Sequence, residues 1–243
     1  MEREICLIKD ILCDMECIRV LKNNIQFLQD GSELKNILIT SLNSGEGKTT
    51  VASSLTMSMA YSGKKTLLMD FNIFNPSVDR LFNTLNYVQK NIDFDMNQYI
   101  RRTEFDNLYI FSMGLANISI RRNRLINKAS ELLTYAKNNF DYTIIDMPSC
   151  HYLSFIQDIA QHVDGCIFVF KEGVSDLKEF VKARDSLELI KVRIIGAVLN
   201  KDIEGEKLVQ ITSKEENRRD NPGILKKRRR GGRDNCQRGE LQP

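Results

Sequence analysis

A short glycine-rich turn carries the residue types that could bind an anion. Gly45, Glu46 and Gly47 are followed at once by Lys48 and Thr49. Glycines allow backbone N–H groups to turn toward an anion, and a helix that starts here directs its positive dipole end at the same place. A lysine can then contact the outer phosphates of a nucleotide, and a threonine hydroxyl can ligate Mg²⁺. The sequence therefore predicts a phosphate-binding P-loop.

The segments on both sides of this turn have the character that a P-loop requires. Residues 37–39 form an apolar run typical of a buried strand, and residues 50–59 are apolar at helical spacing. One position departs from the usual G-x-x-x-x-G-K-S/T spacing, because Leu42 holds the place of the first glycine. An ordinary glycine-rich turn before a helix is the alternative, and the flanking strand and helix favour the P-loop.

Two acidic residues end apolar runs further along the chain. Asp70 follows residues 66–69, and Asp146 follows residues 142–145. The carboxyl ends of parallel strands meet at one edge of a sheet, where ligands bind. A Walker B motif brings a carboxylate to the metal of a bound nucleotide in this way, although strands also end in Asp for turn reasons. With a P-loop upstream, we expect Lys48 to lie beside the two acids.

Strand-like apolar runs and helix-like periodic segments alternate along the chain. The expected strands are residues 37–39, 66–69, 108–112, 142–145, 165–170 and 192–199, and the expected helices are residues 1–30, 50–59, 125–139 and 175–190. Residues 83–107 have no clear pattern. The alternation predicts an α/β, doubly wound fold with a mostly parallel sheet covered by helices on both faces.

Composition suggests three parts within the 243 residues. Residues 1–32 form an N-terminal helical segment, and residues 33–212 form the nucleotide-binding domain. Residues 213–243 are polar and basic, and we expect them to be disordered. Such a tail could bind anionic lipid or nucleic acid through its charge. Because aromatic residues are not interleaved with the basic ones, a solvated tail is favoured, and we do not expect nucleic acid as a partner.

The cysteine pattern and the hydropathy favour a cytoplasmic chain. The six cysteines form no C-x-x-C pair and have no metal-ligand spacing with His151 or His162, so we expect reduced thiols. Cys150 and His151 suggest a nucleophile and its base, but neighbouring side chains rarely face each other, so coincidence is preferred. No apolar run approaches the roughly eighteen residues of a membrane span, and charges stand where a signal peptide would be apolar.

The motifs together resemble those of the bacterial tyrosine kinases of capsule and exopolysaccharide synthesis, the BY-kinases, in their cytoplasmic single-domain form. The likeness is carried by residues 19–27, 39–41, 45–49, 67–76, 142–148, 164–165 and 196–201. It implies a P-loop NTPase fold of the deviant Walker type. It also implies an ATP- and Mg²⁺-dependent, non-specific protein-tyrosine kinase that regulates capsular or exopolysaccharide biosynthesis. The H-R-D, D-F-G and V-A-I-K motifs of eukaryotic-type kinases are absent from the sequence.

The resemblance also implies roles for individual residues. It makes Lys48, Asp70 and Asp146 catalytic, with Asp70 activating the hydroxyl of the accepting tyrosine. It makes Thr49, Asp70 and Asp146 the residues that hold Mg²⁺. The implied ATP-binding residues are Ser44, Gly45, Glu46, Gly47, Lys48, Thr49, Thr50 and Asn200.

Two positions depart from the family pattern after the strand that ends in Asp70. Asn72 replaces a second acid, and Phe74 stands where the family has Arg. An amide brings no negative charge to Mg²⁺ and is a poor proton acceptor, so we expect Asn72 to reduce activity. One alternative is therefore a nucleotide-binding regulator with impaired kinase activity. Another is a partitioning-type switch ATPase, although such proteins usually have a lysine near the position of Asn43.

The resemblance further implies protein partners. The family's oligomerisation motif, E-x-x-R-x-x-R, is matched by Glu16 and Arg19, and Lys22 replaces the last Arg. Lysine keeps the charge but loses the bidentate fork, so we expect a weakened homo-oligomer. A transmembrane activator of the polysaccharide co-polymerase type would recruit the chain to the inner face of the membrane. The substrates would be protein tyrosines. Family members usually end in a tyrosine cluster, whereas no tyrosine follows Tyr152 here.

Overall fold

A computed structural model describes residues 16–28, 33–84, 99–112, 118–200 and 209–212. All of these residues belong to one compact unit, residues 1–213. The basic tail predicted to be disordered lies outside the described residues, as does the predicted helical segment before Glu16. None of the described helices is long and apolar enough to cross a bilayer.

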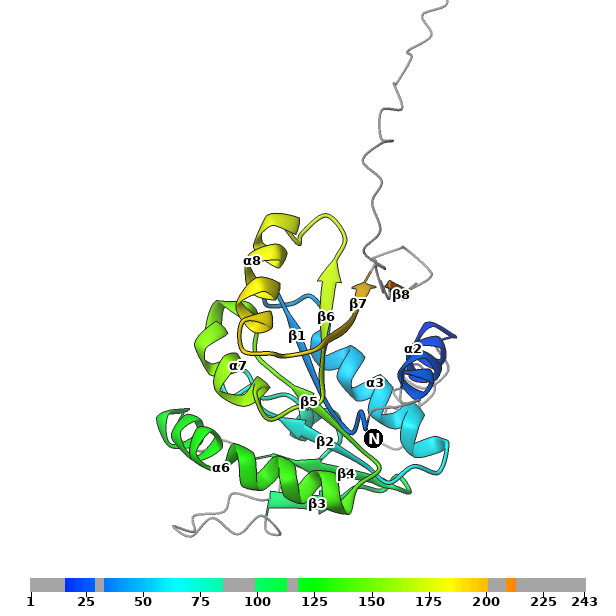
Figure 1. Ribbon diagram of the computed structural model, residues 1–243. Helices are drawn as coiled ribbons and strands as arrows, with labels where there is room; N and C mark the ends of the chain where they lie inside the picture. The colour runs from blue at the N-terminus through cyan, green and yellow to red at the C-terminus, as the bar shows by residue number, and fades with distance from the viewer. Residues whose placement is uncertain (1–15, 29–32, 85–98, 113–117, 201–208, 213–243) are drawn as a thin grey trace, which may run out of the picture. The chain divides into compact units, whose positions relative to one another are not determined.

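Within the described residues, eight strands form a single sheet in the order β3-β4-β2-β5-β1-β6-β7-β8 (Figure 1). They are β1 (Asn36–Ser41), β2 (Thr66–Asp70), β3 (Ile100–Arg102), β4 (Leu108–Phe111), β5 (Tyr142–Asp146), β6 (Gly165–Lys171), β7 (Ile194–Asn200) and β8 (Val209–Thr212). The six inner strands pair in parallel. The outer strands β3 and β8 pair antiparallel with their neighbours. The sheet is therefore mostly parallel, as predicted.

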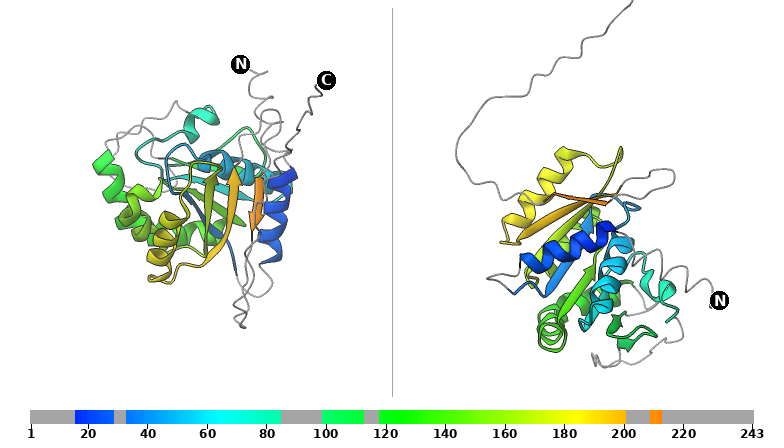
Figure 2. Two further views of the ribbon diagram at one scale, coloured as in Figure 1. Left: turned by 90° about the horizontal axis from the view of Figure 1, so that it is seen from above. Right: turned by 90° about the vertical axis from the view of Figure 1, so that its right-hand side faces the viewer.

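Helices cover both faces of this sheet (Figures 1 and 2). They are α2 (Glu16–Phe27), α3 (Lys48–Tyr61), α4 (Val78–Leu81), α6 (Ile118–Asn139), the 3₁₀ turn η1 (Cys150–Tyr152), α7 (Leu153–Ala160) and α8 (Leu177–Glu188). Apolar side chains of α2, α3 and α4 join one core cluster, and those of α6, α7 and α8 join another. The two clusters lie on opposite faces, which confirms the doubly wound arrangement.

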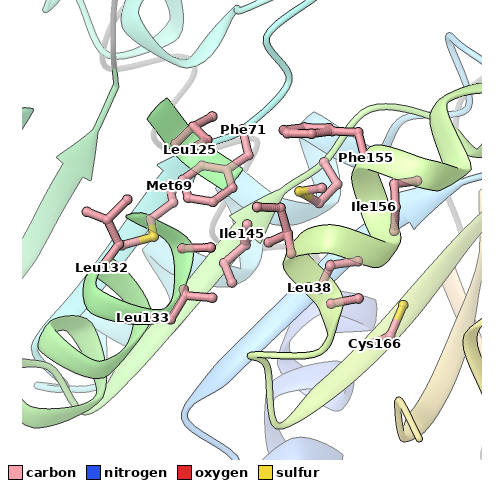
Figure 3. Packing of buried hydrophobic residues seen from close by; sticks show 14 of the residues in the cluster. Leu38, Met69, Phe71, Leu125, Leu132, Leu133, Ile145, Phe155, Ile156 and Cys166 are labelled. Carbon is pink, nitrogen blue, oxygen red and sulfur yellow. The ribbon is translucent and has the colours of Figure 1, made fainter. Parts of the chain in front are cut away.

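The central strand β1 shows how the sequence produces two cores. Successive side chains of a strand point to opposite faces, so Ile37 and Ile39 join the cluster of α3 while Leu38 joins the other one. All six residues of β1 are buried, as expected for a strand covered on both faces. Figure 3 shows Leu38 and Ile145 packed with residues of α6 and α7, Phe155 among them.

The elements predicted from sequence are present, with shifts at their ends and some additions. Helix α6 begins at Ile118 rather than at Leu125. The prediction did not include α4, α7, β3 or β8. Strand β3 has only three residues and lies in the segment that shows no pattern. Such short elements have too few residues to display a period, and their tertiary contacts decide their structure.

Candidate nucleotide site

The turn between β1 and α3 has the backbone of an anion-binding loop. Gly45 and Gly47 have φ angles of 81° and 92°, which favour glycine. Gly47 precedes the first residue of α3 and gives that helix no side-chain cap. The first N–H groups of a helix have no partner within the helix, so an anion can satisfy them here. Helix α3 starts at Lys48, as the P-loop interpretation requires.

The sheet topology places this turn where ligands bind in doubly wound folds. Strand β1 lies between β5 and β6 and runs parallel to both. The chain leaves β1 toward α3 on one face, whereas it leaves β5 and β6 toward α7 and α8 on the other (Figure 1). Loops that diverge in this way open a crevice at the carboxyl ends of the strands. The predicted site therefore lies at the topological switch point.

Thr49 and Asp146 meet directly at this switch point. The Thr49 hydroxyl donates to Oδ2 of Asp146 at 2.6 Å. The other carboxylate oxygen, Oδ1, is buried and has no hydrogen-bond partner among the described residues. A buried acceptor without a partner is rare, and a water on a Mg²⁺ ion would satisfy it. The hydroxyl, the free oxygen and the glycine turn thus fit a Mg²⁺-nucleotide.

Asp70 lies beside Asp146, because the two residues are register partners on the adjacent strands β2 and β5. Its carboxylate accepts hydrogen bonds from three backbone N–H groups, each at 3.1 Å. Oδ1 accepts from Asn72, and Oδ2 accepts from Ser77 and Val78 at the start of α4. Asp70 is therefore fixed in place by the loop and helix that follow its own strand.

Burial shifts the pKa values of both acids upward, but to different extents. Burial first and the charge of the neighbouring Asp146 second raise the pKa of Asp70 from 3.8 to about 8, and the three N–H bonds partly oppose this rise. Burial also raises the pKa of Asp146, and because the Thr49 hydrogen bond and the charge of Lys48 oppose this rise, the resulting pKa is about 6. Asp146 thus ionises first, and Asp70 keeps its proton at neutral pH when no cation is bound.

Helix α4 is held by a buried ion pair, which in turn fixes the amides that contact Asp70. Asp79 accepts hydrogen bonds from Arg101 Nη1 at 2.9 Å and from the Thr84 hydroxyl at 2.7 Å. The Ser112 hydroxyl donates to its second oxygen. These contacts join α4 to β3 and to the end of β4. No local sequence pattern indicates this network, because its members are up to 33 residues apart.

The two positions that depart from the family pattern have defined contacts. Asn72 is buried, and its backbone N–H is one of the groups that contact Asp70. Phe74 stacks on Tyr152 with ring centroids 3.6 Å apart and an interplanar angle of 12°. The stack joins the loop after β2 to the loop after β5. Sequence reasoning did not identify Tyr152 as part of this region, and nothing in its local pattern indicates it.

The other predicted nucleotide contacts surround the P-loop. Asn200, at the end of β7, donates from Nδ2 to the backbone carbonyl of Glu46 at 3.2 Å. Ser44, Gly45 and Thr50 are exposed at the turn and the start of α3. The Glu46 side chain is fully buried and accepts hydrogen bonds from Asn43 and Ser175. The structure thus brings Asn200 to the P-loop.

Cys150 and His151 do not form a nucleophile and base. Burial raises the pKa of the Cys150 thiol to about 11, so it stays protonated at neutral pH. The His151 ring instead lies 3.3 Å from the Ser149 hydroxyl, measured from Nδ1. Among the described residues, no group of three or more His, Cys, Asp and Glu side chains could hold a metal ion by itself. Mg²⁺ does not need one, because it takes most of its ligands from phosphates and water.

Helix α2 presents the charged stripe predicted from sequence. Ile18, Leu21 and Ile25 are buried in the core cluster that includes α3. The side chains of Glu16 and Arg19 are exposed, and Arg19 Nη1 lies 3.6 Å from Glu16 Oε2. Such an exposed pair adds little stability. An exposed stripe can serve as a contact between subunits, and that role stays a prediction.

A mostly parallel sheet with a P-loop at its switch point and two neighbouring acids at the ends of β5 and β2 defines a P-loop NTPase. The family model ParA, described as "NUBPL iron-transfer P-loop NTPase", matches residues 33–214. A relative named tyrosine-protein kinase CpsD, from Streptococcus agalactiae, is 32% identical in an alignment of 196 residues that covers 76% of this chain and 82% of the relative. The chain therefore belongs to the ParA-type P-loop NTPases and, within them, to the bacterial tyrosine kinase family.

Solved structures agree with this assignment at the level of the fold. The kinase domain of the Escherichia coli tyrosine kinase ETK superposes with a TM-score of 0.69 at 24% identity, covering 79% of this chain and 76% of that domain. The septum site-determining protein MinD from Pyrococcus horikoshii, solved with Mg-ADP, superposes with a TM-score of 0.59 at 24% identity, covering 68% and 70%. Both likenesses support the same doubly wound P-loop architecture.

Proposed function

We propose that this protein is an ATP- and Mg²⁺-dependent protein-tyrosine kinase that regulates capsular or exopolysaccharide biosynthesis. The observation that carries the proposal is the meeting of Thr49, Asp70 and Asp146 beside the Lys48 turn. The relatives named tyrosine-protein kinases, which match over most of their own length, supply the class of reaction.

Each site residue has a role that follows from its surroundings. The turn N–H groups and Lys48 bind the phosphates of ATP. Thr49 and Asp146 hold Mg²⁺, directly or through water. An ion held by these residues would supply positive charge to compensate the phosphate oxygens. Asp70 takes the proton of the tyrosine hydroxyl as that oxygen bonds to the γ-phosphorus and the bond from this phosphorus to ADP breaks.

The shifted pKa of Asp70 suits the role of general base. A tyrosine hydroxyl has a pKa of about 10, and proton transfer is most effective when donor and acceptor are closely matched. Without a cation, burial and the charge of Asp146 raise the pKa of Asp70 to about 8, which is nearer to that of the phenol than the pKa of an ordinary carboxyl. A cation bound at Asp146 favours the ionised form of Asp70, which is the form that accepts a proton.

Asn72 lowers the rate of transfer under this proposal. Asn72 is buried and its backbone N–H contacts Asp70, while its side-chain amide brings no negative charge to the metal. The Asn72→Asp variant should therefore have a higher turnover than wild type. The turnover of the wild type itself separates the two candidates, because a wild type as active as a competent kinase would rule out the alternative of a nucleotide-binding regulator with impaired activity.

The partners follow from the family and from the exposed stripe on α2. We propose that Glu16, Arg19 and Lys22 contribute to a homo-oligomer, and that a transmembrane activator of the polysaccharide co-polymerase type brings the protein to the inner face of the cell membrane. Phosphorylation would then occur on tyrosines of a neighbouring protein chain.

A phosphotyrosine assay tests the proposal. The full chain is incubated with Mg²⁺-ATP and a tyrosine-bearing acceptor protein, with and without an activator segment, and Lys48→Ala is the inactive control. We expect phosphotyrosine with wild type, more with Asn72→Asp and none with Lys48→Ala. ATP hydrolysis stimulated by DNA or lipid without phosphotyrosine would instead indicate a partitioning-type switch ATPase.

A further inference from the structure

Glu46 is an acidic residue inside a turn that binds anions, and its side chain is fully buried. A carboxylate aimed at the phosphates would repel them. Instead, Oε2 accepts from the backbone N–H of Asn43 at 3.0 Å, and Oε1 accepts from Asn43 Nδ2 at 3.0 Å. A buried charge is tolerated only when hydrogen bonds satisfy it, so these contacts identify Glu46 as an internal support of the turn.

The third hydrogen bond to Glu46 comes from a distant part of the chain. Ser175, in the loop between β6 and α8, donates from its hydroxyl to Oε1 at 2.6 Å. The same hydroxyl oxygen accepts the backbone N–H of Lys171, the last residue of β6, at 2.9 Å. Ser175 thus uses its hydroxyl as donor and acceptor at once. A hydroxyl bonded to a carboxylate at this distance makes a strong, charge-assisted hydrogen bond.

The backbone of Glu46 is held from a further side. Asn200 Nδ2 donates to its carbonyl oxygen, and the Asn200 amide occupies the space where a Cβ on Gly47 would lie. The carbonyl of Asn200 accepts the N–H of Glu172 at 3.1 Å, which joins β7 to the loop that contains Ser175. The peptide units around Glu46 are therefore connected to the chain after β6 and after β7.

We propose that Glu46 and Ser175 form a positioning pair that sets the conformation of the phosphate-binding turn. The glycines on both sides of Glu46 allow the turn many conformations, and only some of them aim the N–H groups at an anion. A ligand that binds one conformation loses affinity in proportion to the fraction of molecules that lack it. By fixing Glu46, the Ser175 hydroxyl keeps that fraction small.

This inference rests on nucleotide binding within the proposed function and does not require tyrosine transfer. Its test is therefore the affinity of the full chain for Mg²⁺-ADP, measured by calorimetry. The variants are Ser175→Ala, which removes the hydroxyl, and Ser175→Thr, which keeps it. Ser186→Ala is the matched control, since its hydroxyl lies on α8 and donates to the Lys182 carbonyl at 2.8 Å.

We expect Ser175→Ala to weaken Mg²⁺-ADP binding by about 10- to 100-fold, the effect of losing one charge-assisted hydrogen bond. Ser175→Thr should bind within about twofold of wild type, and Ser186→Ala should bind as wild type does. Rescue by threonine distinguishes the hydroxyl contact from a general loss of packing. Thermal unfolding without nucleotide checks that every variant is folded.

A second comparison tests the partnership itself. In Glu46→Gln the charge is gone, so the Ser175→Ala change should cost less in this background than it does in wild type. Equal costs in both backgrounds, or full affinity in Ser175→Ala, would overturn the positioning pair while leaving nucleotide binding intact. Failure of wild type to bind Mg²⁺-ADP would overturn the proposed function and this inference together.

Discussion

The buried carboxyl of Asp70 should make the stability of the metal-free protein depend on pH. Its pKa is raised from 3.8 to about 8 in the folded protein, mainly by burial and then by the charge of Asp146. Between these values the native state binds one proton that the unfolded state has released. The free energy of unfolding therefore falls as pH rises, and the full penalty is present above pH 8.

The size of the effect follows from linkage. One proton of difference corresponds to about 1.4 kcal/mol per pH unit, so Asp70 should contribute a loss of about 3 kcal/mol between pH 5 and pH 7. The Asp70→Asn variant has no proton to release and should lack this slope. Its absolute stability also changes, because an amide nitrogen cannot accept the N–H groups of Ser77 and Val78. The slope is therefore the quantity to compare.

Urea unfolding of the full chain between pH 5 and pH 7, with a chelator and without nucleotide, measures both slopes. Asp146 affects the two proteins alike in this range, because residue 70 is uncharged in either one. Asp106→Asn is the control, since the Asp106 side chain is 92% exposed, and its curve should run parallel to that of wild type. If the Asp70→Asn curve ran parallel as well, Asp70 would be ionised in the native state and the argument from burial would be wrong.

Three further changes test other parts of the structure. Lys48→Met should weaken Mg²⁺-ADP binding roughly 100-fold, because losing a buried cation opposite phosphate costs about 2–5 kcal/mol. Calorimetry measures this affinity, and near-normal binding would argue against the P-loop. Ser54→Ala should raise the free energy of unfolding by about 1 kcal/mol, since the Ser54 hydroxyl is buried without a partner among the described residues. Urea unfolding measures this free energy, and a lower value in the variant would show that the hydroxyl makes a stabilising contact. Lys191→Gly should stabilise the protein by about 1 kcal/mol, because Lys191 has a φ of 63°, a left-handed conformation that costs less for glycine. An unchanged midpoint of urea unfolding would show that the backbone at Lys191 is not strained.

The sequence could predict those parts of the fold that repeat along the chain. Residues 66–70 and 142–146 appear as strands at the predicted positions, because a buried parallel strand is a continuous apolar run. The meeting of Lys48, Asp70 and Asp146 followed from the rule that strand ends share one edge. These are local patterns combined with one general rule of topology.

The remaining parts of the site depend on contacts that no local pattern encodes. Ser175 contacts Glu46 from 129 residues away, and its own neighbourhood is that of an ordinary turn. Helix α4 has four residues, too few to show a period, yet its amides hold Asp70. Residues 1–15 and the basic tail lie outside the described residues, so the predictions made for them stay predictions.

Both borders of the sheet consist of very short strands that run against their neighbours. Strand β3 has three residues, two of them Arg101 and Arg102, and β8 has four. A border this short offers few free backbone groups to another chain, and the exposed Arg102 places a charged side chain on the β3 border. Fibre-like stacking through added strands is thereby disfavoured, and self-assembly is directed to surfaces made by helices.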